Sequence, residues 1–357
     1  MFNFKKRETS FFLAHLLHPT SNVDMFIHSP REQTFWNSLV HVGSSNLVLP
    51  SVYASIKRKK LDSKVPRDLL IYLNEIYKYN YERNKEILRQ INDISSIFKN
   101  NKINHIFIKG AALLIFKPYD SICERMIGDI DVLVSEKDLL KSKKLLYENG
   151  YENNIENEEV LAPEIDNFNK KNRHLERLTN PNFIASVELH RGVLSSKYSS
   201  LLSTDEMLEC KQKIDGYWIP SKFHLWYHSI FNLQFNDNAI KLNYLSFRTL
   251  IDVLYLEPKD IQNNIDDFPK SIKLFYNLVS IYFDEYPACS KFLRFKYILQ
   301  LEFPFFLNLN SFCIKTISFF QLLISRGFLF VDSKKYREKI FSNLPLIKKK
   351  LIQFWKK

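Results

Sequence analysis

Apolar residues in the first third of the chain recur at the spacing of an α-helix. Residues 68–100 contain almost no helix breaker, and Ile87, Ile91, Ile94 and Phe98 would lie on one face of a helix. Residues 1 to about 100 are therefore predicted to be helical.

The pattern then changes to short runs rich in β-branched and aromatic residues, which is typical of strands. Three strands are predicted in this part of the chain: 103–108, 127–134 and 183–190. A short helix over 111–116 should end near Pro118, because proline cannot continue a helix. Ser135 is a suitable N-cap for a second helix over 136–148, which Gly150 would end.

Residues 152–182 are polar and predicted to be rich in loops, and helical patterns return from Pro220 onward. Three of these helical segments are the clearest: 224–233, 245–256 and 272–301. An α+β fold is expected, with a small α/β core between two helical regions. The expected domains are an N-terminal helical region over 1–100, an α/β core over 101–195 and a C-terminal helical domain over 196–357.

The composition is that of a folded protein with a large core. Of the 357 residues, 45% are apolar and 15% are aromatic, which excludes a disordered chain. The four cysteines are scattered without a CxxC pair, so reduced thiols in a cytoplasmic protein are expected. The N-terminus lacks the pattern of a signal peptide, and the apolar stretch 303–331 is interrupted by Lys315 and Arg326, so no transmembrane helix is expected.

Asp129 and Asp131 stand two positions apart on a predicted strand, so both side chains should point to the same face. Two carboxylates placed in this way suit a divalent metal, and the alternative is an exposed strand end with unpaired acids. Lys109 and Gly110 form a turn after the preceding strand, where the glycine would let a polyphosphate approach backbone N–H groups. Together these features indicate metal-assisted chemistry on a nucleotide.

The net charge of +12 has two interpretations. It could mark a surface that binds nucleic acid, anionic lipid or a polyphosphate substrate, or it could be a solvated basic surface. The basic runs at 57–60 and 348–350 lie far in sequence from the two aspartates. The solvated surface is therefore favoured, and peripheral membrane contact is not expected.

Three motifs resemble those of a bacterial family described as uncharacterised nucleotidyltransferases, within the DNA polymerase beta-like superfamily. They are the Lys-Gly-x-x-Leu turn at 109–113, the Arg-x-x-Gly-Asp-x-Asp strand at 125–131 and the Glu-Leu-His strand at 188–190. The resemblance covers roughly residues 103–192, and the flanking helical regions match only in general pattern. It implies a small polymerase-beta-like mixed sheet, an NTP substrate and Mg²⁺ or Mn²⁺ as cofactor.

The resemblance also implies roles for individual residues. Asp129, Asp131 and Glu188 would bind the catalytic metal, and Glu188 would accept the proton of the attacking hydroxyl, unless it is only a surface acid on an edge strand. Lys109 and Gly110 would bind phosphate. The chain has Gly-Ala where the wider superfamily usually has Gly-Ser, and the gap between Gly110 and Asp129 is long; the narrower family shares both departures.

More than one role is open for three further residues, Arg125, His190 and His174. Arg125 would bind the triphosphate, hold Asp129 in a bidentate pair or form a plain salt bridge in a loop. His190 would point to the same face as Glu188 and could contact nucleotide or acceptor. His174 resembles a recurring histidine of the family and is the weaker candidate.

Other polar pairs favour a structural interpretation. His224 and His228 have the spacing of a helical metal pair, but no glutamate follows His224, so they are expected to pack in a core or to stack on a nucleotide. Arg248 and Asp252 are an i,i+4 pair that should brace the C-terminal helices.

The expected function is transfer of a nucleoside monophosphate from an NTP to a hydroxyl acceptor, which could be a small molecule, a protein or RNA. One alternative is a non-catalytic nucleotide- or nucleic-acid-binding protein that retains the fold. Another is a partner protein that binds RNA or membranes through its basic C-terminus. The complete set of Asp129, Asp131 and Glu188 favours the enzyme.

Overall fold

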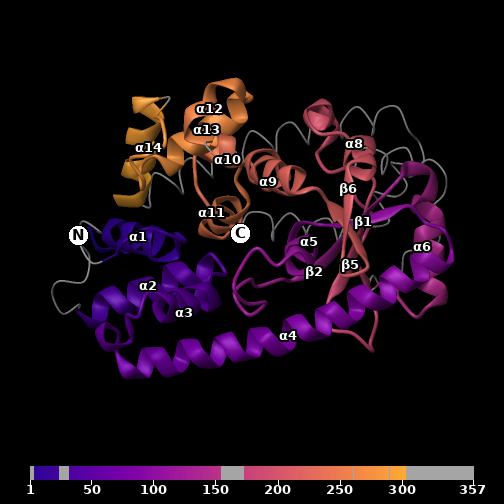
Figure 1. Cartoon of the computed structure of the whole chain (residues 1–357), viewed down its shortest axis with the longest axis horizontal. Coiled ribbons are helices and arrows are strands. Elements are labelled where there is room, and N and C mark those ends of the chain that lie inside the picture. Colours follow the sequence, from indigo (N-terminus) through magenta and orange to yellow (C-terminus); the bar gives the residue numbers. More distant parts are fainter. Residues whose placement is uncertain (1–3, 24–31, 154–172, 260, 289, 303–357) are drawn as a thin grey trace, which may run out of the picture. The chain divides into compact units, whose positions relative to one another are not determined.

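The chain folds as an α+β protein, as its pattern predicts (Figure 1). The structure is a computed structural model that describes residues 4–23, 32–153, 173–259, 261–288 and 290–302. Residues 1–302 belong to one compact unit, and the domain boundaries near residues 100 and 195 stay predictions. Three predicted features lie wholly or partly outside the described residues: the loop-rich segment 152–182, the apolar stretch 303–331 and the basic run 348–350.

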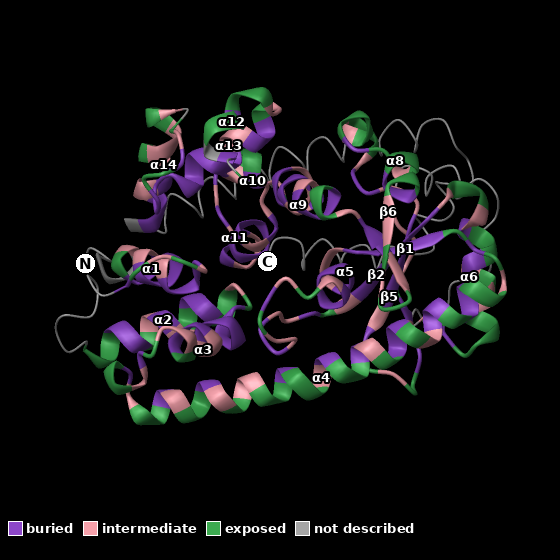
Figure 2. Cartoon of the chain, viewed as in Figure 1, coloured by how far each residue is buried: buried purple, intermediate pink, exposed green. Residues whose placement is uncertain are grey.

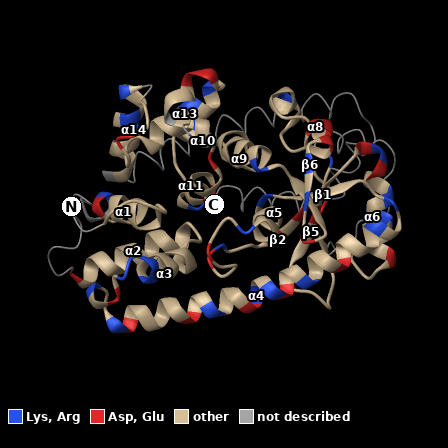
Figure 3. Cartoon of the chain, in the orientation of Figure 1, with Lys and Arg blue, Asp and Glu red and all other residues tan. Residues whose placement is uncertain are grey.

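The N-terminal region is helical, as predicted. Its helices are α1 (Phe4–Leu17), α2 (Gln33–Ser45), α3 (Leu49–Arg58) and α4 (Arg67–Asn100), with a 3₁₀ turn η2 (Asp62–Lys64) before α4. The predicted apolar face of α4 is buried against the rest of the protein (Figure 2). Its opposite face carries exposed i,i+3 ion pairs such as Lys85–Glu82 and Lys78–Glu75 (Figure 3).

A mixed sheet follows, and it has the strand order β1-β2-β5-β4-β3. Its strands are β1 (His105–Ile108), β2 (Asp129–Val134), β3 (Glu152–Asn153), β4 (Leu178–Thr179) and β5 (Ser186–His190). β2 and β5 are parallel, and the other neighbouring strands are antiparallel. This arrangement agrees with the predicted mixed sheet core.

Polar side chains of α4 determine where two of these strands begin. Arg83 Nε donates a hydrogen bond to the carbonyl oxygen of Ile127 at 3.1 Å, so β2 starts at Asp129, two residues later than predicted. Gln90 bonds both the N–H and the carbonyl of Ala185, at 3.1 and 2.8 Å. The backbone groups before β2 and β5 are thus satisfied by a helix instead of a neighbouring strand.

Two helices flank the central strands: α5 (Lys109–Phe116) and α6 (Leu139–Glu148), the latter after a 3₁₀ turn η3 (Glu136–Asp138). The prediction that Ser135 caps α6 is wrong. Ser135 stands before η3 with extended backbone, but its hydroxyl accepts no hydrogen bond from a backbone N–H of the helix; it donates one to the carboxylate of Asp138 at 2.8 Å. Gly150 follows α6 with a left-handed φ of 81°, as expected of a residue that ends a helix.

The C-terminal half of the described chain is mainly helical. Its elements are η4 (Ser196–Leu201), α8 (Thr204–Glu209), β6 (Lys211–Ile214), β7 (Tyr217–Pro220), α9 (Lys222–Phe231), the π-helix η5 (Asn232–Asn236), α10 (Ala239–Leu242), α11 (Phe247–Leu256), α12 (Ile261–Asn264), η6 (Ile265–Asp267), α13 (Lys270–Val279) and α14 (Lys291–Glu302). The helices predicted over 224–233 and 245–256 are confirmed as α9 and α11. The segment 272–301 is divided into α13 and α14, with Pro287 in the break.

The hairpin β6–β7 has no counterpart among the predicted elements. Its turn consists of Asp215 and Gly216, which both have positive φ, at 49° and 90°. Such a pair is typical of a two-residue type I′ turn, so the sequence does contain the signal for this hairpin.

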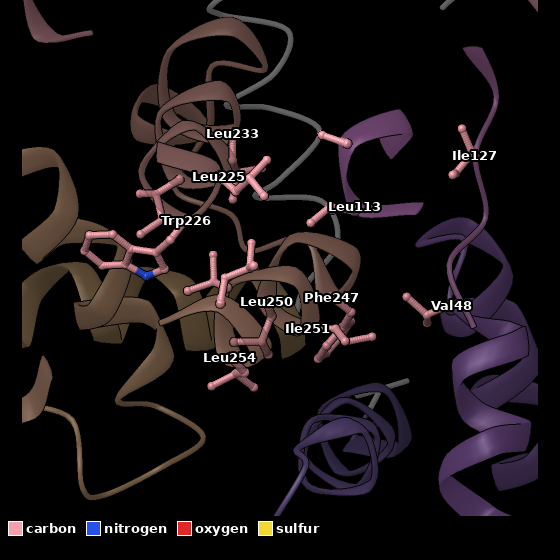
Figure 4. Close-up of a cluster of buried hydrophobic side chains, with 14 of the residues drawn as sticks. Val48, Leu113, Ile127, Leu225, Trp226, Leu233, Phe247, Leu250, Ile251 and Leu254 are labelled. Carbon is pink, nitrogen blue, oxygen red and sulfur yellow. The ribbon is translucent and has the colours of Figure 1, made fainter. Parts of the chain in front are cut away.

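An apolar cluster joins α5, α9 and α11 (Figure 4). Leu113 of α5, Leu225 of α9 and Leu250 of α11 are at most 2% exposed. Burial of such side chains stabilises a fold by about 2 kcal/mol each. The cluster therefore holds α9 and α11 against the helix that begins at the end of β1.

Candidate active site

Strand register brings Asp131 and Glu188 together. Asp131 pairs with Ile108 of β1 on one side and with Glu188 of β5 on the other. Because paired residues present their side chains on the same face of a sheet, the two carboxylates are neighbours. Asp131 is 1% exposed and Glu188 is 5% exposed, so their charges have to be compensated within the protein.

Lys109 and His190 compensate the charge of Asp131. The ammonium of Lys109 forms an ion pair with Oδ1 of Asp131, and Nε2 of His190 lies 2.7 Å from the same oxygen. Burial alone would raise the pKa of Asp131, but the hydrogen bonds from His190 and Lys109 hold this pKa well below its usual value. Asp131 is therefore ionised at neutral pH.

Arg177 connects the other two carboxylates. Its Nε lies 2.6 Å from Oε1 of Glu188, and its Nη2 lies 3.0 Å from Oδ2 of Asp129. Burial, followed by repulsion from Asp131 and Glu188, raises the pKa of Asp129. Burial also acts to raise the pKa of Glu188, but hydrogen bonds from His190 and Arg177 outweigh it and lower this pKa to about 2. The sequence analysis missed Arg177, which lies in a polar stretch without periodicity.

Asp131, Glu188 and His190 form a cluster that could hold a divalent metal, since one ligand atom from each lies within 4.8 Å of the others. Asp129 belongs to the predicted metal set but stands outside this cluster. Carboxylate oxygens suit Mg²⁺, and an added imidazole also suits Mn²⁺. Nε2 of His190 must carry a proton to bond Asp131, so in this arrangement the histidine orients a carboxylate instead of offering a ligand atom.

A cavity with a volume of about 200 Å³ lies beside these carboxylates. It brings together five of the predicted site residues: Lys109, Gly110, Arg125, Asp129 and Asp131. Glu188 and His190 are not among its lining residues, but both contact Asp131, which does line it. The structure thus brings these seven residues together, and their roles in metal and nucleotide binding stay predictions.

The turn at the end of β1 has an unusual backbone. Lys109 has a left-handed φ of 52°, which is uncommon for a residue with a side chain and is often found at functional sites. At Gly110, a Cβ atom would lie 3.3 Å from the side chain of Ile127. A side chain here would therefore crowd Ile127, which would have to shift by a few tenths of an ångström, so glycine allows close packing against the loop before β2.

The cavity has further polar walls. Its other charged or hydrogen-bonding residues are Arg173, His228, Ser229, Asn232, Asp237, Arg248, Thr249 and Asp252. Nη1 of Arg173 is buried and has no hydrogen-bond partner within the described part of the chain. Arg173 was missed by the sequence analysis, because it stands next to the polar loop segment and belongs to no motif.

Arg125 does not hold Asp129. Its Nε and Nη2 bond the two carboxylate oxygens of Asp252 at 2.8 and 2.9 Å, in a bidentate pair that is almost completely buried. The expectation that Asp252 pairs with Arg248 is therefore wrong as well. The planar fork of Arg125 occupies both oxygens of Asp252, and Arg248 lines the cavity instead.

The remaining histidines have separate environments. His224 contacts the hydroxyl of Ser221 at 2.8 Å and Glu206 at 3.2 Å, and it does not form a metal pair with His228. His228 lines the cavity, and burial, reinforced by the charge of Lys109, lowers its pKa to about 3, so it is neutral. The ring of His174 packs against the ring of His190, with 5.1 Å between the two ring centres.

A family profile matches more than half of the chain, over residues 32–253, and this family is described as uncharacterised nucleotidyltransferase. The chain belongs to this family. The match begins next to α2 and ends within α11, so it includes every residue that lines the cavity beside Asp129 and Asp131. The resemblance seen in three short motifs thus extends to the helices around the sheet.

None of the curated proteins matches the chain. Among the described helices of the chain, none combines the length and the apolar character that a membrane crossing needs.

Proposed function

We propose that the protein transfers a nucleoside monophosphate from an NTP, such as ATP, to the hydroxyl group of an acceptor, with Mg²⁺ or Mn²⁺ as cofactor and in the cytoplasm. The observation that carries this proposal is the pairing of Asp131 with Glu188 across β2 and β5, next to the Lys109–Gly110 turn. The family match supports the reaction class.

Charges of both signs line the cavity, as this reaction requires. Asp129 and Asp131 are among its carboxylates, and Arg173 and Arg248 are among its cationic side chains. A metal held by the carboxylates supplies charge stabilisation at the attacking and leaving oxygens. The arginines and Lys109 bind the triphosphate, which positions the α-phosphate near the carboxylates.

Glu188 supports the site as third carboxylate and accepts the proton of the acceptor hydroxyl. In the structure its Oε1 is bonded by Arg177, whose side chain is 63% exposed. Proton acceptance therefore requires Arg177 to move toward solvent, which its exposure permits. Asp129, which is more accessible than Glu188, completes the ligand set once Arg177 has moved.

The proposal is tested by calorimetric titration of each NTP, with and without Mg²⁺, into wild type and the Asp129→Ala/Asp131→Ala variant. Magnesium-dependent binding should be lost in the variant. Transfer is then measured with NTP radiolabelled at the α-phosphate, added to protein and fractionated cell extract. Binding without label transfer would favour the non-catalytic alternative, and no binding by folded protein would refute the nucleotide site.

Arg248→Ala should weaken NTP binding about tenfold, because one charge-assisted hydrogen bond to phosphate is lost. Arg248→Lys keeps the charge but loses the planar fork, so an intermediate affinity is expected. Calorimetry measures both, and Lys270→Ala, an exposed lysine outside the cavity, serves as control. Equal affinities for Arg248→Ala and the control would remove Arg248 from the site.

Arg177→Ala should raise the affinity for Mn²⁺ about tenfold, because a positive charge between Asp129 and Glu188 is removed. The effect should be no larger, because the Arg177 side chain is mostly exposed and solvent screens its charge. Mn²⁺ titration by calorimetry measures the effect. Lys144→Ala, which removes a surface charge of α6, is the matched control. A fall in Mn²⁺ affinity would mean that Arg177 orients the ligands instead of competing with the metal.

A further inference from the structure

A second cavity, of about 260 Å³, lies at the opposite end of β1 from Lys109. It is formed by the end of α4, the turn into β1 and the hairpin β6–β7. Four lysines line it, namely Lys99, Lys102, Lys211 and Lys213, together with His105 and Trp218. The proposed transfer reaction uses none of these residues.

The hairpin fixes the position of two of the lysines. Lys211 and Lys213 stand two apart on β6 and so point to one face, and Lys213 pairs directly with Trp218 of β7. Their ammonium groups lie 4.7 and 5.7 Å from the centre of the Trp218 ring. Lys211 also hydrogen-bonds the side chain of Asn104, in the turn before β1.

These lysines lack a counter-charge. Within the described part of the chain, none of the four has a carboxylate partner at salt-bridge distance, and the one acid of the hairpin turn, Asp215, pairs with Lys117 at 2.6 Å. Like charges gathered in one concave site repel one another, so an anion would be attracted there. Desolvation lowers the pKa of Lys211, which is consistent with its enclosed position.

His105 adds a polar atom that needs a different kind of partner. The residue is 3% exposed, and its Nδ1 lies 3.0 Å from the carbonyl oxygen of Ile103, so Nδ1 carries the proton. Its Nε2 is buried and has no hydrogen-bond partner among the residues that the structure describes. In the neutral ring Nε2 is an acceptor, which suits a hydroxyl group and not a phosphate oxygen.

We propose that this cavity binds a small phosphate ester that also carries a hydroxyl group, with phosphate on the lysines and hydroxyl on Nε2 of His105. Sugar phosphates and nucleotides both have this chemistry. The cavity is at the small end of the range of ligand sites and suits one such molecule, in contrast to the long groove that a nucleic-acid strand follows.

Binding of AMP, ribose phosphate and inorganic phosphate is measured by calorimetry on the full chain, at low salt in EDTA. Both organic phosphates should bind more tightly than inorganic phosphate, and Lys211→Ala/Lys213→Ala should weaken them about tenfold or more. Tighter binding of AMP than of ribose phosphate would identify nucleotides as the source. Lys137→Ala, an exposed lysine elsewhere, should leave these affinities unchanged.

His105→Phe tests the hydroxyl contact. The His105 ring packs near Phe98 and Phe107, at 5.2 and 5.8 Å, so a phenyl ring can be accommodated. The preference for ribose phosphate over inorganic phosphate should disappear, with folding checked by circular dichroism. The proposal would be overturned if AMP and ribose phosphate bound equally well to wild type and to the double lysine variant. It would also be overturned if the protein bound single-stranded RNA but no small phosphate. Neither result would affect the transfer reaction, which is assigned to the first cavity.

Discussion

Asp131→Asn should reduce transfer of the labelled nucleotide by about 10³-fold or more and should abolish magnesium-dependent NTP binding. The change removes one carboxylate charge without changing the shape of the side chain. Its amide oxygen can still accept the hydrogen bond from Nε2 of His190, which now lies 2.7 Å from the carboxylate. The protein should therefore remain folded, and the loss should report on the metal and nucleotide site instead of on the fold.

The control for this substitution is Asp215→Asn, which removes an exposed carboxylate from the hairpin turn. It should leave both NTP binding and transfer at the wild-type level. Circular dichroism and urea unfolding establish that both variants are folded. If Asp131→Asn retained full transfer activity, the metal would have to be held elsewhere, and the assignment of Asp131 would be abandoned.

The carboxylates of the site could be predicted because their positions follow from local rules. Asp129 and Asp131 share a face since side chains alternate along a strand, and the parallel pairing of β2 with β5 then places Glu188 beside Asp131. The long helix α4 was likewise predictable from its apolar period. For the two aspartates and for α4, the information lies within a few residues of the feature that it determines. Glu188 is far from them in sequence, and its role was indicated by the family resemblance.

The arginines of the site could not be predicted in the same way. Arg177 reaches Asp129 across 48 positions, and Arg125 reaches Asp252 across 127. No periodicity within a segment specifies which distant side chain fills a given space. The prediction for Arg248 failed for this reason: an i,i+4 acid was available on its own helix, but Arg125 offered that acid a better bidentate geometry.

Arg125→Met should lower the free energy of unfolding by about 3–5 kcal/mol, as measured by urea denaturation. The guanidinium and carboxylate side chains of the pair are only 12% and 6% exposed. Removal of the arginine leaves the Asp252 carboxylate buried with the hydroxyl of Tyr119 as its remaining hydrogen-bond partner among those described. An uncompensated charge in such a place is among the most destabilising changes known for a folded protein.

A double variant separates the pair from a general packing effect. Arg125→Met/Asp252→Asn removes both charges, so it should recover much of the stability that Arg125→Met loses. Lys85→Ala breaks an exposed ion pair of α4 and should cost less than about 1 kcal/mol. If Arg125→Met instead left stability unchanged and weakened NTP binding, the arginine would be a triphosphate ligand. The buried bidentate pair argues that its main role is to anchor the loop before β2 to α11, which fixes the backbone from which Asp129 and Asp131 project.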